Sequence, residues 1–195
     1  MATSPNLKSH FFSYLMEHNR PHLDGLQQWI FQPGMLFHAW GKWWGDRGPR
    51  PAPHAGLDLY SFADAHGMLH TVDRHINIPA AFAGTIVKID QDFLGQSIYI
   101  SHEIWSDRGR QLYSAYGHTA PRHSLQTGEK VAEGEIIGHI SGGSGKKTAI
   151  APHVHITFAW MPVPVDPDRL NWENLGNDPG ITLIDPLAVL SPPGS

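Results

Sequence analysis

The 195-residue sequence contains no cysteine, and that absence excludes several kinds of site. Disulfide bridges, thiolate nucleophiles and Cys-rich zinc centres all require a sulfur atom that this chain does not supply. Any metal ion must therefore be held by histidine and carboxylate side chains. The chain has 14 histidines from which such a site could be built.

An excess of positive charge and long apolar runs are also missing. The formal net charge is -4 and no basic run with interleaved aromatic residues stands out, which argues against a nucleic-acid partner. No apolar run approaches the roughly 18 residues of a membrane span, so no span is expected. No signal peptide is visible in residues 1–16. Composition alone leaves open a cytoplasmic protein and the mature part of an exported one.

Glycine and proline, by contrast, are abundant, with 20 and 16 copies. They indicate many turns and few long helices, so the predicted fold class is mainly β with antiparallel pairing. Gly128 and Gly134 are expected to make two turns that flank a very short strand around Val131. Runs of β-type residues, each bounded by Gly, Asp, Asn or Ser, predict strands at 76–83, 85–89, 97–101, 111–116, 136–140 and 153–160.

The two ends of the chain give different patterns. Apolar residues at helical spacing predict a short N-terminal helix in residues 7–18, ended by Pro21. Residues 31–53 are rich in Trp, Gly and Pro and indicate an irregular arm. Its tryptophans either pack over the sheet, which is the commoner role for such rings, or form a wall of a substrate groove. The segment from Met161 onward is expected to wrap the domain without regular structure.

His153-Val154-His155 is the most informative local motif. Side chains alternate between the two faces of a strand, so two histidines at this spacing point in the same direction. A pair of this kind, taken alone, is more often structural than metal-binding.

A second motif lies far upstream, where His54 and Asp58 are separated by three residues. Pro51, Pro53 and Gly56 argue against a helix there, but positions four apart also share one face of a strand. Two imidazoles and one carboxylate from distant segments, completed by a water, form the open tetrahedral shell of catalytic zinc. A third segment, Tyr116-Gly117-His118, offers another imidazole.

The order of these motifs, with a Gly-rich turn at 141–145 before Pro-His-x-His, resembles the lysostaphin-type (LytM-like) zinc metallopeptidases. That family cleaves peptide bridges or stem peptides of bacterial peptidoglycan. The resemblance runs from about His54 to Ile156, and includes the segments 79–87, 98–102 and 127–138. Asp185-Pro186-Leu187 is similar to the family's closing segment. The implied fold is the duplicated hybrid motif, an antiparallel sheet or sandwich with an open groove.

The resemblance implies one zinc ion with a bound water, held by His54, Asp58 and His155. His118 and His153 would be the two unligated catalytic histidines. Zinc would polarise the scissile carbonyl and lower the pKa of its water. One histidine would accept the proton of the water, and the other would stabilise the oxyanion or protonate the leaving amine. The sequence does not say which histidine has which role.

The implied protein is a zinc metalloendopeptidase that acts on peptide or peptidoglycan substrates outside the cytoplasm, in the periplasm, in the cell wall or after secretion. Residues 1–46 would form the N-terminal helix and arm, residues 47–190 the metallopeptidase domain, and residues 191–195 a tail. The sequence does not indicate an oligomeric state.

The chain also departs from the family pattern. Residues 59–78 form a longer segment that carries His66, His70 and His75, expected to be a hairpin or loop at the groove rim. Solvated loop histidines are expected there in preference to a second metal site. Thr157 stands where many members have Glu, residues 146–151 lengthen the link to Pro-His, and no tyrosine occurs at 47–53. Substrate specificity and the oxyanion partner therefore stay open.

Two rival functions use parts of the same sequence. A catalytically silent LytM-like module could bind and regulate a cell-wall amidase, but such modules typically lose metal ligands and none is lost here. The paired-glycine segment also resembles biotinyl and lipoyl carrier domains. Lys88 and Lys130 lack the setting of a modifiable lysine beside Met on an exposed hairpin, and a carrier does not need the histidine motifs.

Overall fold

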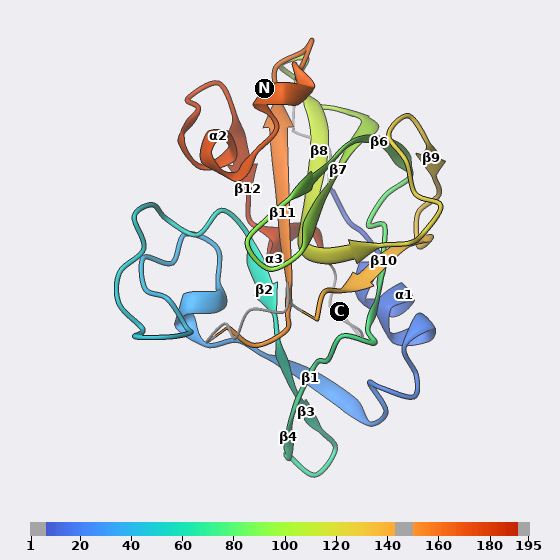
Figure 1. The fold of residues 1–195 in the computed structure, drawn as a ribbon, viewed down its shortest axis with the longest axis vertical. Coiled ribbons are helices and arrows are strands. Elements are labelled where there is room, and N and C mark those ends of the chain that lie inside the picture. The colour runs from blue at the N-terminus through green and yellow to red at the C-terminus, as the bar shows by residue number, and fades with distance from the viewer. Residues whose placement is uncertain (1–6, 143–149, 191–195) are drawn as a thin grey trace.

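The structure is a computed structural model, and it describes residues 7–142 and 150–190 (Figure 1). The predicted mainly β class is confirmed, with a nine-stranded sheet and a separate three-stranded sheet. Neighbouring strands in both sheets pair antiparallel. Residues 143–149, which include most of the Gly-rich turn and of the lengthened link at 146–151, lie outside the described residues.

The main sheet contains each of the six predicted strands. Its path is β12-β11-β8-β7-β6-β9, while β2 pairs with β11, β10 pairs with β8, and β5 pairs with β10. The short strand between paired glycines is confirmed, and Gly128 and Gly134 have φ of 89° and 77°. The strands are β2 (Leu57–Leu59), β5 (Asn77–Pro79), β6 (Gly84–Gln91), β7 (Gln96–Trp105), β8 (Gln111–Pro121), β9 (Lys130–Val131), β10 (Ile136–Ile140), β11 (Val154–Met161) and β12 (Thr182–Ile184).

β11 is the strand that organises the functional site. All of its residues are buried, and it pairs with β8 along one edge and with β2 and β12 along the other. Its sequence is accordingly almost entirely apolar, with His155 and Thr157 as the polar exceptions. Polar side chains on such a strand require partners in the interior, because an unpaired buried polar group is costly.

The predicted N-terminal helix is confirmed as α1 (Phe11–His18). Its apolar face, Phe11, Phe12 and Leu15, is buried in the main hydrophobic core. The same core contains Ile98 of β7 and Ile156 of β11. The helix therefore packs on the sheet that carries the site.

The second sheet consists of β1 (Leu26–Ile30), β3 (Ser61–Asp64) and β4 (Leu69–Thr71). The expected hairpin in residues 59–78 is confirmed as β3 and β4, which project at the lower end of the view in Figure 1. Its expected place at the groove rim is wrong: no residue of 59–78 lines the pocket of the site described below, and instead β3 pairs with β1 and Phe62 packs against Trp29 in the core. Burial of these rings draws the hairpin toward the N-terminal segment.

The segment after β11 has more regular structure than predicted. It contains η2 (Pro167–Arg169), α2 (Trp172–Asn177), β12 and α3 (Pro186–Val189). The side chains of Asp166, Asn171 and Asp185 accept hydrogen bonds from backbone N–H groups at the start of the three helical turns. These caps stabilise elements too short to show periodicity in the sequence.

No helix within the described ranges is both long and apolar enough to cross a membrane.

His102, on β7, couples stability to pH. It is fully buried between the carbonyl of Ala83 and the hydroxyl of Ser114, and burial lowers the pKa of its imidazole to about 4. Between pH 6.5 and 4 the unfolded chain therefore binds a proton that the folded chain does not, so stability decreases as pH falls, by up to about 3 kcal/mol. Urea unfolding of His102→Gln across this range should show a shallower decrease than the wild type. Parallel curves would contradict this assignment.

Candidate metal centre

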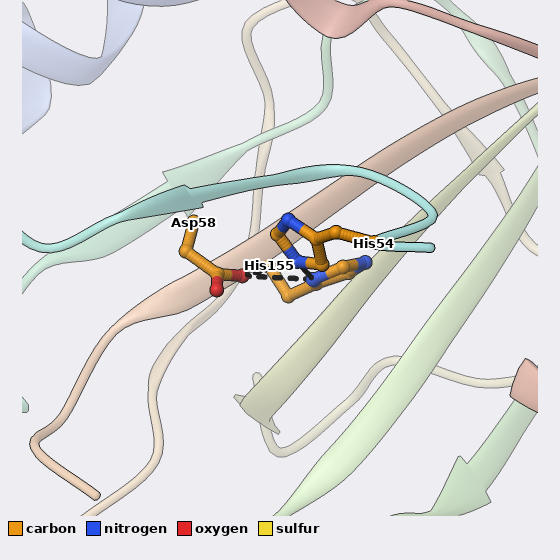
Figure 2. A group of neighbouring side chains, drawn as sticks. All are labelled: His54, Asp58 and His155. Atoms are coloured by element: carbon orange, nitrogen blue, oxygen red, sulfur yellow. Dashed lines mark hydrogen bonds and ion pairs between the residues drawn. The ribbon is translucent and has the colours of Figure 1, made fainter. Parts of the chain in front are cut away.

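Three side chains bring one donor atom each to a common point. His54 Nε2 lies 3.0 Å from His155 Nδ1 and 3.2 Å from Asp58 Oδ1, and the last two atoms are 2.8 Å apart. In Figure 2 the Asp58 carboxylate and the His54 ring both turn toward His155. All three residues are buried. Asp58 on β2 faces His155 on β11 across the strand pair, whereas His54 lies in the preceding loop.

The second nitrogen of each imidazole fixes its tautomer. Nδ1 of His54 lies 3.0 Å from the carbonyl oxygen of Leu36, which can only accept, so Nδ1 carries the hydrogen. Nε2 of His155 lies 2.9 Å from the Thr157 hydroxyl, which itself donates to the carbonyl of Ala55. Nε2 of His155 is therefore the donor. The two facing atoms, His54 Nε2 and His155 Nδ1, both present lone pairs.

The charges of this group also suit a cation. Burial would raise the pKa of the Asp58 carboxyl, but the neighbouring imidazoles outweigh that effect and hold it well below its ordinary value. Burial lowers the pKa of His155 to about 4. An ionised carboxylate and neutral imidazoles are the forms that bind metal. In tetrahedral zinc sites with bonds of about 2.0–2.1 Å, ligand atoms are about 3.3 Å apart, close to the spacing found here. The donor set fits zinc.

His118 lies beside this group and is held by Asp92. The backbone N–H of His118 donates to Asp92 Oδ2 at 2.8 Å, and its Nδ1 lies 3.2 Å from Asp92 Oδ1. His118 also has a positive φ of 63°, a backbone conformation that is uncommon for a residue other than glycine. With Nδ1 donating to Asp92, Nε2 of His118 keeps a lone pair.

Asp92 is an ionised carboxylate in the turn between β6 and β7. It accepts hydrogen bonds from the N–H groups of Leu94 and Gly95 and from the Ser97 hydroxyl. Burial would raise its pKa, but the hydrogen bonds and charge of His118, together with the bond from Ser97, hold the pKa well below its ordinary value. Sequence reasoning missed Asp92. Its only signal was an Asp-x-x-Gly turn, which is common in hairpins without any catalytic role.

His153 completes the set of five side chains. Its Nδ1 donates to the carbonyl of Ala151 at 2.8 Å, and its Nε2 lies 3.8 Å from Asp58 Oδ1. The centroid of its ring is 4.8 Å from that of His118. Burial, more than any neighbouring charge, lowers the pKa of His153, so the ring is neutral at neutral pH.

These five residues line one pocket of about 340 Å³. Its other walls come from four separate parts of the chain: Lys42 and Trp44; Arg50, Pro51, Ala52, Pro53 and Ala55; Phe93; and Trp172 of α2. The tryptophans of the arm therefore divide between the two roles considered for them. Trp44 lines the pocket and Trp43 is buried, while Trp40 is 62% exposed.

The structure brings together all five residues singled out in the sequence. His66, His70 and His75 do not join them. Across the described parts of the chain, His54, Asp58 and His155 are the one group of three or more potential ligands with donor atoms close enough to share an ion. His70 instead bonds to Asp64 and stacks on Phe62, and His75 stacks on His22.

Sequence reasoning also missed the residues that contact the second oxygen of Asp58. Trp43 Nε1 donates to Asp58 Oδ2 at 2.7 Å, and Arg50 Nη2 lies 3.7 Å from the same oxygen. Thr157, noted only as a departure from the family, bonds to His155. A cluster of tryptophans in a sequence indicates aromatic packing, but it does not indicate which carboxylate an indole N–H will reach.

An antiparallel β-fold that carries a buried His-Asp-His group and two further histidines in a pocket defines a candidate hydrolytic metal centre. The model of peptidase family M23 matches residues 63–167, more than half of the chain, and the chain belongs to this family of zinc-dependent peptidases. The matched segment contains His118, His153 and His155. His54 and Asp58 precede it.

The chain is also similar to solved structures, of which the solution structure of lysostaphin supports the same fold. The solution structure of lysostaphin aligns with a TM-score of 0.50 at 18% identity, covering 99% of this chain and 59% of that one. Lysostaphin from Staphylococcus simulans, described as an antimicrobial peptidase, gives a TM-score of 0.42 at 20% identity, covering 82% of this chain and 50% of that one. The catalytic domain of EnpA, a prophage-encoded M23 protein from Enterococcus faecalis, gives a TM-score of 0.40 at 20% identity, covering 74% of this chain and 97% of that one.

This chain thus spans about half to three-fifths of the two lysostaphin chains. No curated protein matches the sequence.

Proposed function

We propose that this chain is a zinc-dependent endopeptidase that hydrolyses peptide bonds in the stem peptides or cross-bridges of bacterial peptidoglycan. The observation that supports it most directly is the convergence of three lone-pair donors, His54 Nε2, Asp58 Oδ1 and His155 Nδ1, within 3.2 Å of one another. Lone pairs at this distance repel unless a cation lies between them. Membership of family M23 supports peptidoglycan as the substrate and a site of action outside the cytoplasm.

The three donors would hold one zinc ion with a bound water. When bound, zinc supplies Lewis acidity, which polarises the scissile carbonyl and makes water a better nucleophile at neutral pH. The remaining chemistry is proton transfer, and it falls to the two histidines that are not needed as ligands.

His118 is proposed as the general base. Its Nε2 accepts a proton from the attacking water as the water oxygen bonds to the carbonyl carbon. The imidazolium formed is stabilised by the buried, ionised Asp92, which holds Nδ1–H. The proton then passes from His118 Nε2 to the amide nitrogen as the C–N bond breaks, leaving a carboxylic acid and an amine, which become a carboxylate and an ammonium group when the second proton of the water moves to the amine.

His153 is proposed to orient the water. With Nδ1–H bonded to Ala151, its Nε2 can accept a hydrogen bond from a water in the pocket. Because burial keeps the ring neutral, His153 can hold the water without competing for its proton. This gives the two histidines different roles, which the sequence left open.

The pocket walls indicate how a peptide would be held. Trp44, Phe93 and Trp172 present rings, and Lys42 and Arg50 present positive charge, around the five central residues. Flat rings pack against a peptide backbone and shield the reacting bond from water.

The direct test is digestion of purified peptidoglycan by the purified chain with no partner protein. Zinc loading would be measured on the same sample, and new peptide ends would be identified by mass spectrometry. Zinc binding with new amine and carboxylate ends is expected. If the chain bound zinc but cleaved none of the peptidoglycan preparations, the result would favour the silent module that regulates an amidase. Absence of zinc binding would contradict the proposal altogether.

The role of Asp92 gives a separate prediction. In Asp92→Asn the amide NH2 can donate to Nδ1 of His118, which favours the opposite tautomer and places the hydrogen on Nε2. We expect kcat to fall roughly 100-fold or more while zinc content is unchanged. Steady-state kinetics on a synthetic cross-bridge peptide would measure this.

Asp90→Asn is the matched control, because Asp90 is an exposed carboxylate near the same turn, paired with Lys88. Equal activity of the two variants would show that Asp92 does not act through His118.

A further inference from the structure

We propose that Trp43 is a positioning residue for the metal ligand Asp58, and that the arm of residues 31–53 is therefore part of the zinc site. This inference rests on the proposed function. It concerns a segment that lies upstream of the part matched by family M23, residues 63–167.

Trp43 is fixed in place on several sides. Its side chain is buried, its ring stacks on Tyr60 with centroids 4.8 Å apart, and the ring of His153 meets it edge-on at 5.1 Å. Its indole nitrogen can only donate, so it cannot itself be a ligand. The N–H points at Asp58 Oδ2 from 2.7 Å, a short bond of the kind made to an ionised acceptor.

The two oxygens of Asp58 therefore have different surroundings. Oδ1 faces the two imidazole donors, His54 and His155. Oδ2 accepts from Trp43 and also lies 3.7 Å from the guanidinium of Arg50. With Oδ2 engaged by the arm, the carboxylate is oriented so that Oδ1 alone is presented to a metal ion.

The same arm also holds His54. The carbonyl of Leu36 accepts from His54 Nδ1, and the backbone of His54 exchanges hydrogen bonds with His38 and Ala39 at 2.9 and 3.0 Å. Two of the three donors thus depend on residues of the arm, whose loops lie beside β2 in Figure 1.

The arm is itself closely packed at Gly34. A Cβ at this position would lie 2.6 Å from the backbone nitrogen of Trp43 and 2.8 Å from the carbonyl oxygen of Gly41. Arg50 donates to the carbonyl of Gly34. The backbone of Trp43 therefore packs closely against Gly34, with no room for a side chain between them, while the rings of Tyr60 and His153 hold the indole in place.

The test replaces Trp43 by Phe, which keeps an aromatic ring and removes only the donor. The zinc Kd, measured by competition with a chromophoric chelator, is expected to rise about 10- to 100-fold, the usual effect of losing a partner of a metal ligand. Trp40→Phe is the matched control, because Trp40 belongs to the same arm but is 62% exposed. Its zinc Kd should equal that of the wild type.

A purely structural role for Trp43 would weaken binding without altering the ligands, so a spectroscopic readout is needed. With Co²⁺ in place of zinc, the wild type should show the strong visible absorption of a four-coordinate ion. In Trp43→Phe the freed Oδ2 can approach the metal, and the higher coordination number should weaken that absorption. An unchanged Co²⁺ spectrum together with a zinc Kd within twofold of the wild type would overturn the inference.

The wild-type chain provides a second measurement in case Trp43→Phe does not fold. In ¹⁵N-labelled protein the indole N–H signal of Trp43 should shift when zinc is added, while that of Trp40 should not. A Trp43 signal that zinc leaves unmoved would also overturn the inference. Failure of the wild type to bind zinc would instead contradict the proposed function, so the two outcomes are distinguishable.

Discussion

Replacement of His155 by alanine is expected to abolish zinc binding and peptide hydrolysis together. The change removes Nδ1, one of three donors, from near the start of a buried strand, and leaves His54 and Asp58 as an incomplete pair. Catalytic zinc sites use three protein ligands, so zinc should fall from about one ion per chain to none. Activity should fall to the background rate, since both the Lewis acid and the bound water are lost.

The measurements are metal content after dialysis and release of peptides from purified peptidoglycan. His123→Ala is a suitable control because His123 is an exposed histidine outside the pocket, so it should keep both properties. Circular dichroism would confirm that β11 still forms in the variant. A His155→Ala protein that retains zinc would show that the three donors are not the ligand set.

Replacement of His118 by alanine is expected to separate zinc binding from peptide hydrolysis. Zinc should be retained, because His118 is bonded to Asp92 rather than to the three donors. The rate should fall by roughly 10²- to 10⁴-fold, the usual contribution of a positioned general base. The loss should appear in kcat, since His118 is proposed to act on the proton of the attacking water.

Single-turnover cleavage of a cross-bridge peptide by zinc-loaded wild type and His118→Ala would measure that loss. Rescue of the variant by added imidazole would indicate that a missing base is the cause. If His118→Ala lost zinc, His118 would belong to the ligand set. If its activity were unchanged, another group, His153 first, would have to be the base.

Much of the fold could be predicted because its strands are apolar runs between turn residues. Ile98 and Ile156 lie in strands that the β-type pattern identified, and Gly128 and Gly134 have the positive φ that glycine makes accessible. The N-terminal helix was visible because Phe11 and Leu15 share a helical face. In each case the signal is local, so a single sequence carries it.

The parts that could not be predicted depend on contacts between distant segments. The α2 helix is six residues long, too short for a periodic pattern, yet its Trp172 reaches the pocket. The hairpin at 59–78 was expected near the groove, but its place is decided by packing of Phe62 on Trp29, 33 positions earlier in the chain. Local propensity does not contain such information.

In the site, too, local patterns could be predicted and contacts between distant segments could not. The spacing of His153 and His155 and of His54 and Asp58 indicated which side chains could converge. Asp92 and Trp43 were missed because their bonds depend on tertiary geometry. Asp92 reaches His118 from a turn, and Trp43 reaches Asp58 from an irregular arm. The supporting partners of a site are therefore harder to find than the side chains they support.

The pairing of β2 with β11 has a consequence for how metal would enter. Asp58 and His155 are register partners across this antiparallel pair, so their spacing is set by the backbone ladder. The conformational entropy of bringing them together is lost during folding, before any ion arrives. An ion would therefore meet a rigid pair, and loop ordering would matter only for His54. This preorganisation favours tight binding by a site that needs little rearrangement.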